Sequence, residues 1–239
     1  MRKVIFLAVL AIPIILALTL PVSLIAPLLD LPPGLDRVRG TVWSGNARLQ
    51  QPGQVPLNLT WRWQGGRHWQ WQAADGQTDL RGRWRPATVL VLEDIDGRLE
   101  LDRVDLGHWL MATRPTGYLQ LSMAQAELPS GEVPRLVGTV VWEEARLEGS
   151  VHERLGRIGI DFEPDDQRLQ AKVSSLEPAP IRVRGSIEAD ADRYEVDLWL
   201  RASADRPDLA REIGILGERQ PDGQVRLRLS GALRHDTNL

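Results

Sequence analysis

The sequence has 239 residues and a formal net charge of −3 at pH 7, with 32 acidic and 29 basic side chains whose signs alternate along the chain. This balance argues against nucleic acid as a partner, because such proteins cluster their positive charge. There is no cysteine, which excludes disulfides, thiol catalysis and thiolate metal sites.

The first thirty residues predict a membrane anchor. Val4 to Leu29 carries no charged side chain and follows a short basic stub. The run exceeds the roughly 20 apolar residues that cross a bilayer core, so we place a transmembrane helix at about Val4–Ile25. A cleaved signal peptide is the alternative, but its apolar core is usually only about 7 to 15 residues long. We expect residues 1–29 to form a cytoplasmic stub and anchor, and residues 30–239 to lie in the periplasm, because positive charge stays on the cytoplasmic side.

Beyond the anchor, apolar and polar residues alternate with a period of two, and turns containing glycine recur about every ten residues. The expected strands are Val38–Trp43, Ala47–Gln50, Val55–Gln64, His68–Ala73, Thr78–Arg85, Thr88–Leu92, Gly97–Leu101, Tyr118–Ala124, Val137–Trp142, Ala145–Val151, Arg157–Phe162, Arg168–Ser174, Ile181–Ala189, Tyr194–Ala202 and Gln224–Arg234. The sequence thus predicts a mainly β chain, in which one N-terminal transmembrane helix precedes a curved, twisted antiparallel β-sheet with one or two short helices.

Two segments compete with the strand pattern as helices. Asp105–Ala112 is a short amphipathic candidate. Pro207–Leu216 is the stronger one, with Asp205 as its N-cap and Gly217 as its C-terminal stop.

The chain also resembles itself over ten residues. Gly40-Thr41-Val42-Trp43-Ser44-Gly45-Asn46-Ala47-Arg48-Leu49 is echoed by Gly138-Thr139-Val140-Val141-Trp142-Glu143-Glu144-Ala145-Arg146-Leu147. Two similar halves, 30–126 and 127–239, would explain this echo. Two unrelated hairpins that converged on one pattern would explain it equally well.

Four tryptophans stand at alternate positions around a Gly-Gly pair: Trp61, Trp63, Trp69 and Trp71. A three-residue loop, Gly65-Gly66-Arg67, would pair Trp63 with Trp69 and Trp61 with Trp71 on one face, whereas a two-residue loop would send the pairs to opposite faces. We expect the odd loop, because burying these rings together is the more favourable arrangement.

The next turn extends the same face. A two-residue loop at Asp75-Gly76 would place Leu80 opposite Trp71 and Gly82 opposite Trp69. The shared face would carry Leu57, Leu59, Trp61, Trp63, Trp69, Trp71, Leu80 and Trp84, and the reverse face Asn58, Thr60, Arg62, Gln70, Arg81 and Arg83. The aromatic face is interpreted as the core side of a twisted sheet, with a platform for sugars, lipid or a partner chain as the alternative.

The sequence shows no constellation for catalysis. His68, His108, His152 and His235 are scattered singly, and no G-x-S-x-G, G-x-G-x-x-G or Walker pattern occurs in a matching context. The adjacent carboxylates at Glu143-Glu144 would point apart on a strand. We therefore expect no enzyme and name no catalytic, cofactor-binding or metal-binding residue and no cofactor.

The chain as a whole resembles type II secretion system protein N, an accessory component of the machinery that exports folded proteins across the outer membrane of Gram-negative bacteria. The resemblance rests on the length, the single N-terminal span and three sets of motifs. These are Gly40-Thr41-Val42-Trp43-Ser44-Gly45, Ile213-Gly214-Ile215-Leu216-Gly217, and Asp222-Gly223-Gln224 with Leu229-Ser230-Gly231. It implies a single-pass bacterial inner-membrane protein whose periplasmic domain contacts other type II secretion subunits.

A second family gives a different expectation. Repeated strands behind one anchor are also similar to AsmA-like and lipopolysaccharide-bridge proteins, whose curved sheets hold acyl chains. This resemblance implies a periplasmic lipid-binding or lipid-transfer protein with an apolar groove, and makes lipid an alternative partner.

Overall fold

The computed structural model describes residues 34–50, 54–101, 113–129, 132–149, 152–165 and 168–232. The membrane helix expected at Val4–Ile25 and the helix expected at Asp105–Ala112 lie outside these residues. Among the residues described, no helix has both the length and the apolar character needed to cross a bilayer.

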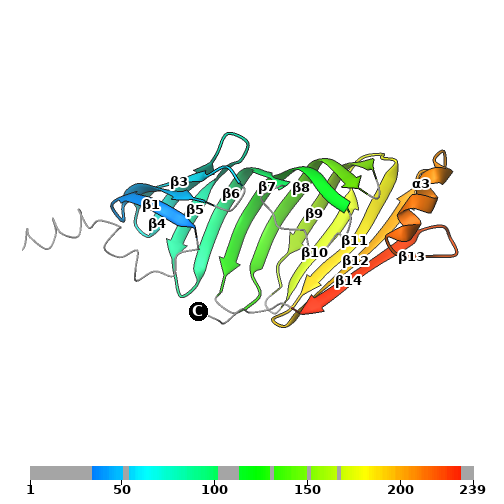
Figure 1. Ribbon diagram of the computed structural model, residues 1–239. Helices are drawn as coiled ribbons and strands as arrows, with labels where there is room; N and C mark the ends of the chain where they lie inside the picture. The colour runs from blue at the N-terminus through cyan, green and yellow to red at the C-terminus, as the bar shows by residue number, and fades with distance from the viewer. Residues whose placement is uncertain are drawn as a thin grey trace, which may run out of the picture. The chain divides into compact units, whose positions relative to one another are not determined.

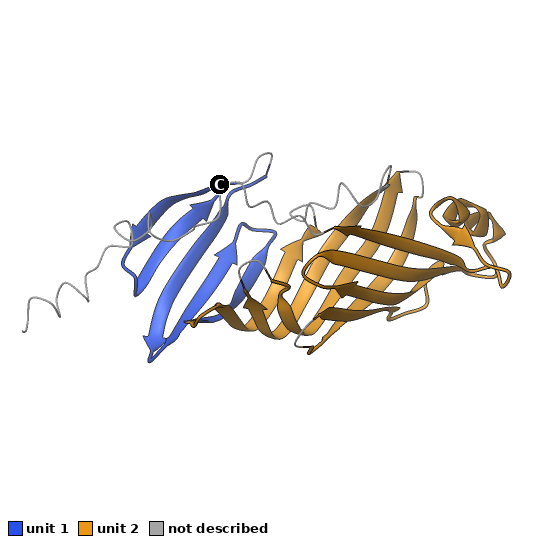
Figure 2. Cartoon of the chain, turned by 90° about the horizontal axis from the view of Figure 1, so that it is seen from below, with its two compact units in different colours: residues 1–85 blue, residues 86–239 orange. Residues whose placement is uncertain are grey.

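The described chain is mainly β and antiparallel, as the alternation predicted, and it divides into two compact units, Met1–Arg85 and Pro86–Leu239 (Figure 2). Unit 1 is a meander in which each strand pairs with the next (Figure 1). Its strands are β1 (Leu35–Gly40), β2 (Ser44–Leu49), β3 (Leu57–Gly65), β4 (His68–Ala74) and β5 (Asp79–Pro86).

Unit 2 continues the antiparallel pattern with longer strands. They are β6 (Leu90–Glu100), β7 (Thr113–Leu128), β8 (Arg135–Gly149), β9 (Glu153–Glu163), β10 (Leu169–Ser175), β11 (Ile181–Ala189), β12 (Arg193–Ala202), β13 (Glu218–Arg219) and β14 (Val225–Ala232). The order departs from the sequence only at the end, where β14 lies between β12 and β13. Figure 2 shows that this sheet is twisted, as sheets of L-amino acids are.

One short α-helix, α3 (Pro207–Glu212), occurs among the described residues, and a 3₁₀ turn, η3 (Ile213–Ile215), extends it. Together they match the helix expected at Pro207–Leu216. The expected N-cap is wrong: Arg206 holds that position without a side-chain cap, and the Asp205 carboxylate instead accepts a hydrogen bond from the Ser203 hydroxyl.

Two expected strand breaks are also wrong. One expected strand ended at Leu92 and another at Trp142, and new strands began at Gly97 and Ala145, but β6 and β8 continue through both gaps. Asp94 and Glu144 adopt positive φ values of 49° and 51°. The backbone therefore changes direction at these residues without ending the strand. At Glu144 the pairing of β8 with β9 shifts between Trp142 and Ala145, which is a β-bulge.

The ten-residue echo corresponds to two different structures. Gly40–Leu49 spans the turn between β1 and β2, whereas Gly138–Leu147 lies inside β8. Along the chain, the boundary between the compact units falls between Arg85 and Pro86, while the segment 126–134 leads from β7 into its partner strand β8. An origin in two similar halves, 30–126 and 127–239, stays a prediction.

The core of unit 2 lies under α3 and η3. Alternate residues of β11 separate the two faces of the sheet: Ile181 and Val183 are buried, and Arg182 and Arg184 are exposed. The buried cluster comprises Ala145, Leu155, Ile158, Val173, Ile181, Val183, Leu200, Leu209, Ile213 and Val225. Leu209 and Ile213 come from the helical segment, so a few helical residues close this end of the apolar face.

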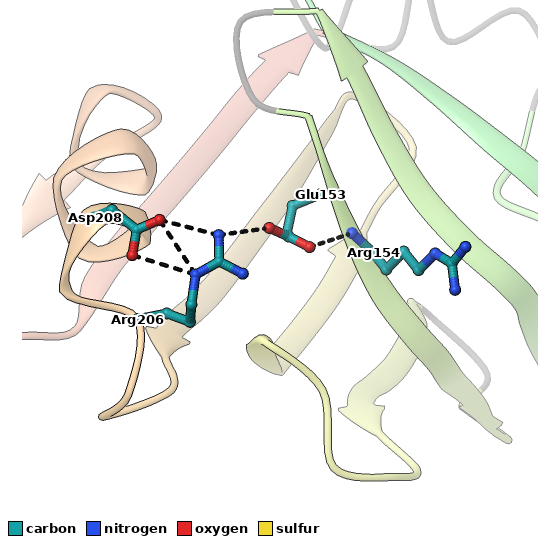
Figure 3. Close-up of polar contacts among 4 residues, drawn as sticks. All are labelled: Glu153, Arg154, Arg206 and Asp208. Carbon is teal, nitrogen blue, oxygen red and sulfur yellow. Dashed lines mark hydrogen bonds and ion pairs between the residues drawn. The ribbon is translucent and has the colours of Figure 1, made fainter.

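An ion-pair bridge ties the start of α3 to β9 (Figure 3). The Arg206 guanidinium donates to Asp208 Oδ2 at 3.0 Å and to Glu153 Oε2 at 3.2 Å, and so links the first turn of the helix to a strand 53 residues earlier. Hydrogen bonds from Arg206 lower the pKa of the Asp208 carboxyl, which keeps it ionised in this bridge.

Two isoleucines of η3 provide a matched test of this packing. Ile213 is 0% exposed and Ile215 is 68% exposed. Ile213→Ala should lower the free energy of unfolding by about 2–5 kcal/mol, because it leaves a cavity in the core. Ile215→Ala should change it by about 0.5 kcal/mol or less. Urea unfolding followed by circular dichroism measures both, and equal effects would show that η3 does not seal the core.

Candidate functional site

The described residues bring none of the sequence's histidines into a cluster. His68 and His152 are both exposed, and His108 and His235 lie outside the described ranges. Within those ranges, no group of three or more histidine, aspartate or glutamate side chains is placed to hold a metal ion. The features that stand out are three surfaces: an aromatic cluster, a polar groove and a charged sheet face.

The hairpin formed by β3 and β4 has the register that parity predicted. Trp63 lies opposite Trp69, and Trp61 lies opposite Trp71. The loop differs in detail from the expected one. Gly65 pairs with His68, and a bulge between Trp63 and Gly65 supplies the extra residue that keeps all four rings on one face.

The expected register of the following hairpin is wrong by two residues. Trp71 lies opposite Gly82, and Trp69 opposite Trp84, whereas the sequence suggested Leu80 and Gly82. The turn is longer than expected because the Asp75 carboxylate accepts hydrogen bonds from two later backbone N–H groups, at 2.9 and 2.7 Å. A shift of two residues preserves the faces, so the aromatic side of β5 is unchanged.

Four rings form what we call the tryptophan cluster: Trp43, Trp63, Trp69 and Trp84. Trp69 stacks on Trp84 with ring centroids 4.7 Å apart, and on Trp43 at 6.1 Å. Trp63 meets Trp43 edge-on at 5.1 Å. Sequence reasoning placed three of these rings together but missed Trp43, which comes from the turn between β1 and β2.

Indole N–H groups hold that turn against the sheet. Trp61 Nε1 donates to the Thr41 carbonyl and Trp69 Nε1 to the Val42 carbonyl, both at 3.1 Å. Gly45 lies under the Trp61 ring, where an added Cβ would come within 2.3 Å of a ring carbon. The Gly40–Gly45 motif therefore serves packing: the turn accepts the indole hydrogen bonds, and Gly45 leaves room for the Trp61 ring.

Burial separates the members of the cluster. Trp69 is 8% exposed and belongs to the core, whereas Trp63 is 41% exposed at the rim. The core interpretation therefore holds at the centre of the cluster, and Trp63 offers an aromatic edge to solvent.

The reverse face of unit 1 is polar, as the alternation predicted. Asn58, Thr60, Arg62, Gln70, Arg81 and Arg83 are all exposed. A groove of about 560 Å³ crosses β2, β3 and β4 on this side, and Ser44, Asn46, Thr60, Arg62, Gln70 and Gln72 are among its lining residues. Trp61 and Trp71 also line it, so the groove combines hydroxyl and amide groups with the positive charge of Arg62 and with apolar ring surface.

The polar face of unit 2 carries ion pairs instead. Asp197 on β12 accepts a hydrogen bond at 2.8 Å from Arg226 Nε on β14, and Arg228 Nε lies 3.8 Å from the same carboxylate. The hydrogen bond from Arg226 holds the pKa of Asp197 below its ordinary value. Asp197 is therefore a fixed negative charge, and Arg226 is occupied by it.

Comparison with known proteins gives one match. The family described as type II secretion system (T2SS), protein N matches residues 34–228. No curated protein and no solved structure matches significantly. The matched range contains the motif around Gly40 and both sets of strands, so it covers the surfaces described above.

Two tryptophans of the cluster test its division into centre and rim. Trp69→Ala should lower the free energy of unfolding by about 3–5 kcal/mol, as truncation of a buried ring does. Trp63→Ala should lower the free energy of unfolding much less, because this ring is already partly exposed to water. Urea unfolding followed by circular dichroism measures both, with Arg62→Ala as a surface control expected within about 0.5 kcal/mol. A larger loss at Trp63 than at Trp69 would contradict the assignment.

Proposed function

The chain belongs to the type II secretion system protein N family, and we propose that it serves protein secretion from an inner-membrane anchor, through protein–protein contacts made in the periplasm. Membership makes it an accessory component of type II secretion. The anchor, the compartment and the mode of action are the proposed part.

The observation that carries the proposal is the extent of the family match. Residues 34–228 include all but the last few described residues, so the match extends over the strands of both units. A broad sheet with polar grooves and an exposed aromatic rim suits contact with other proteins, because aromatic residues and satisfied hydrogen bonds are typical of interfaces.

The N-terminal sequence supports the anchor. Val4–Leu29 is long and apolar enough to span a bilayer, and the preceding basic stub favours a cytoplasmic N-terminus. The sheet would then follow on the periplasmic side.

A second candidate function is lipid binding, which one observation favours. On the apolar face of unit 2, hydrophobic side chains remain only partly buried around the core, including Ile160, Ile187 and Leu198. In the part of the chain that the structure describes, α3 and η3 are the only helical elements that pack on this face. A curved sheet with an open apolar face is what an acyl chain would need.

We propose further that docking, and not side-chain chemistry, is the mode of action. Alanine at His68, His108, His152 or His235, tested singly, should leave secretion of an exported substrate within about twofold of wild type, because docking requires no side chain that transfers a proton. Secretion is measured as the extracellular fraction of that substrate in a strain lacking the native gene. A hundredfold loss from one substitution in a folded protein would instead indicate catalysis.

Co-purification decides between the two candidate functions. The tagged full-length chain, extracted gently from membranes, should bring down other type II secretion subunits, identified by mass spectrometry. Native mass spectrometry of the same preparation shows whether phospholipid is bound. Bound lipid without any secretion subunit, and unchanged secretion on deletion of the gene, would favour lipid binding over docking.

A further inference from the structure

An arginine-rich cleft lies on the polar face of unit 2, opposite the buried core. On β11 and β12, Arg182 pairs directly with Arg201, and Arg184 pairs with Trp199. Ser174 on β10 lies beside Arg184, and Gln224 precedes β14. These side chains line a cleft of about 260 Å³, which we call the arginine cleft.

The positive charge of the cleft is only partly compensated. Arg201 Nη2 lies 3.3 Å from Asp222 Oδ2. Among the described residues, Arg184 donates to a neutral group alone, the Gln224 side-chain oxygen, at 3.2 Å. The Arg182 guanidinium makes no hydrogen bond or ion pair within the described ranges. Like charges directly opposite one another on a sheet are unfavourable, so the pair Arg182 and Arg201 calls for a further anion.

The cleft is preorganised from below. Gln224 is 6% exposed, and its amide bridges Arg184 and Asp222. The Trp199 ring lies between two guanidiniums, 5.9 Å from that of Arg184 and 4.9 Å from that of Arg226. Arg226 is already bound to Asp197, so the arginines left to receive a ligand are Arg182 and Arg184.

We propose that the arginine cleft binds the carboxylates of an extended acidic segment of a partner protein. Arg182 and Arg184 are alternate residues of one strand, so they are spaced by about 6.6 Å, the repeat at which an extended segment presents carboxylates on one side. Each guanidinium can grip a carboxylate through two parallel hydrogen bonds. The inference rests on the proposed function, because it gives protein docking a place and a chemistry.

Other anions fit the cleft less well. Its floor is a paired sheet, whose backbone N–H groups are used in the strand ladder, and none of the described residues supplies it with a helix N-terminus or a glycine-rich loop to cradle a phosphate. Glu188 and Glu195 face each other at the far end of the same face of β11 and β12. An anionic membrane surface would meet these acidic groups together with the arginines, whereas a single acidic segment can lie over the arginines alone.

A binding assay on the full-length chain in detergent tests the cleft directly. The probe is a fluorescein-labelled peptide in which glutamate alternates with threonine, and its binding is followed by fluorescence anisotropy. Arg182→Gln/Arg184→Gln should weaken binding by about tenfold or more, because charge-assisted hydrogen bonds are lost. Arg182→Lys/Arg184→Lys should lie between this variant and the wild type, since lysine keeps the charge but not the two-pronged grip.

Controls separate the cleft from general electrostatics. Arg81→Gln/Arg83→Gln removes two exposed arginines at the same spacing on β5 and should leave peptide binding unchanged. A peptide with glutamine in place of glutamate should not bind. Unchanged binding by the Arg182→Gln/Arg184→Gln variant, with wild-type urea unfolding, would overturn the proposal. So would preferential binding of inorganic phosphate, or of vesicles of phosphatidylglycerol and phosphatidylethanolamine, over the acidic peptide.

A cellular arm distinguishes failure of the cleft from failure of the proposed function. If the wild type co-purifies a secretion subunit and Arg182→Glu/Arg184→Glu does not, the cleft is the docking site. If both retain the subunit equally, docking stands and the cleft proposal fails. If the wild type itself retains no secretion subunit, the proposed function fails first.

Discussion

The strict alternation of side chains along each strand is the constraint on which the rest of the described structure depends. Successive residues of a strand point to opposite faces, so one strand must serve a packed face and a wet face at once. In β11 the buried residues Ile181 and Val183 alternate with the exposed Arg182 and Arg184. The same geometry puts the core of unit 2 on one side of the sheet and the arginine cleft on the other.

Maintaining this alternation over long strands requires local corrections. A shift of one residue would turn every later side chain to the wrong face, whereas a shift of two would not. The bulge between Trp63 and Gly65 restores the parity of the tryptophan hairpin, and the longer turn after Asp75 changes the register by two. In β8 the positive φ of Glu144 likewise accommodates a bulge, and the strand continues beyond it.

These faces bear directly on a role in secretion. A subunit that acts by contact needs surfaces that stay in place when a partner binds, and the packing behind each surface supplies that rigidity. Indole hydrogen bonds hold the turn at Thr41 and Val42, and the buried Gln224 orients Arg184.

The sequence by itself determined the fold class, the pairing of Trp61 with Trp71 and Trp63 with Trp69, and the family, because these depend on periodicity, parity and the order of motifs. The helical segment at Pro207 followed equally from its local signals. Only the tertiary structure showed that β6 and β8 continue through Asp94 and Glu144. Both residues have a positive φ, and the sequence around such a residue looks the same whether the strand continues there or ends in a turn. The tertiary structure also decided that Trp43 joins the cluster and that Arg182, Arg184 and Arg201 meet in one cleft. Residues on different strands become neighbours only through register, and register is set by turns and bulges whose geometry composition does not reveal.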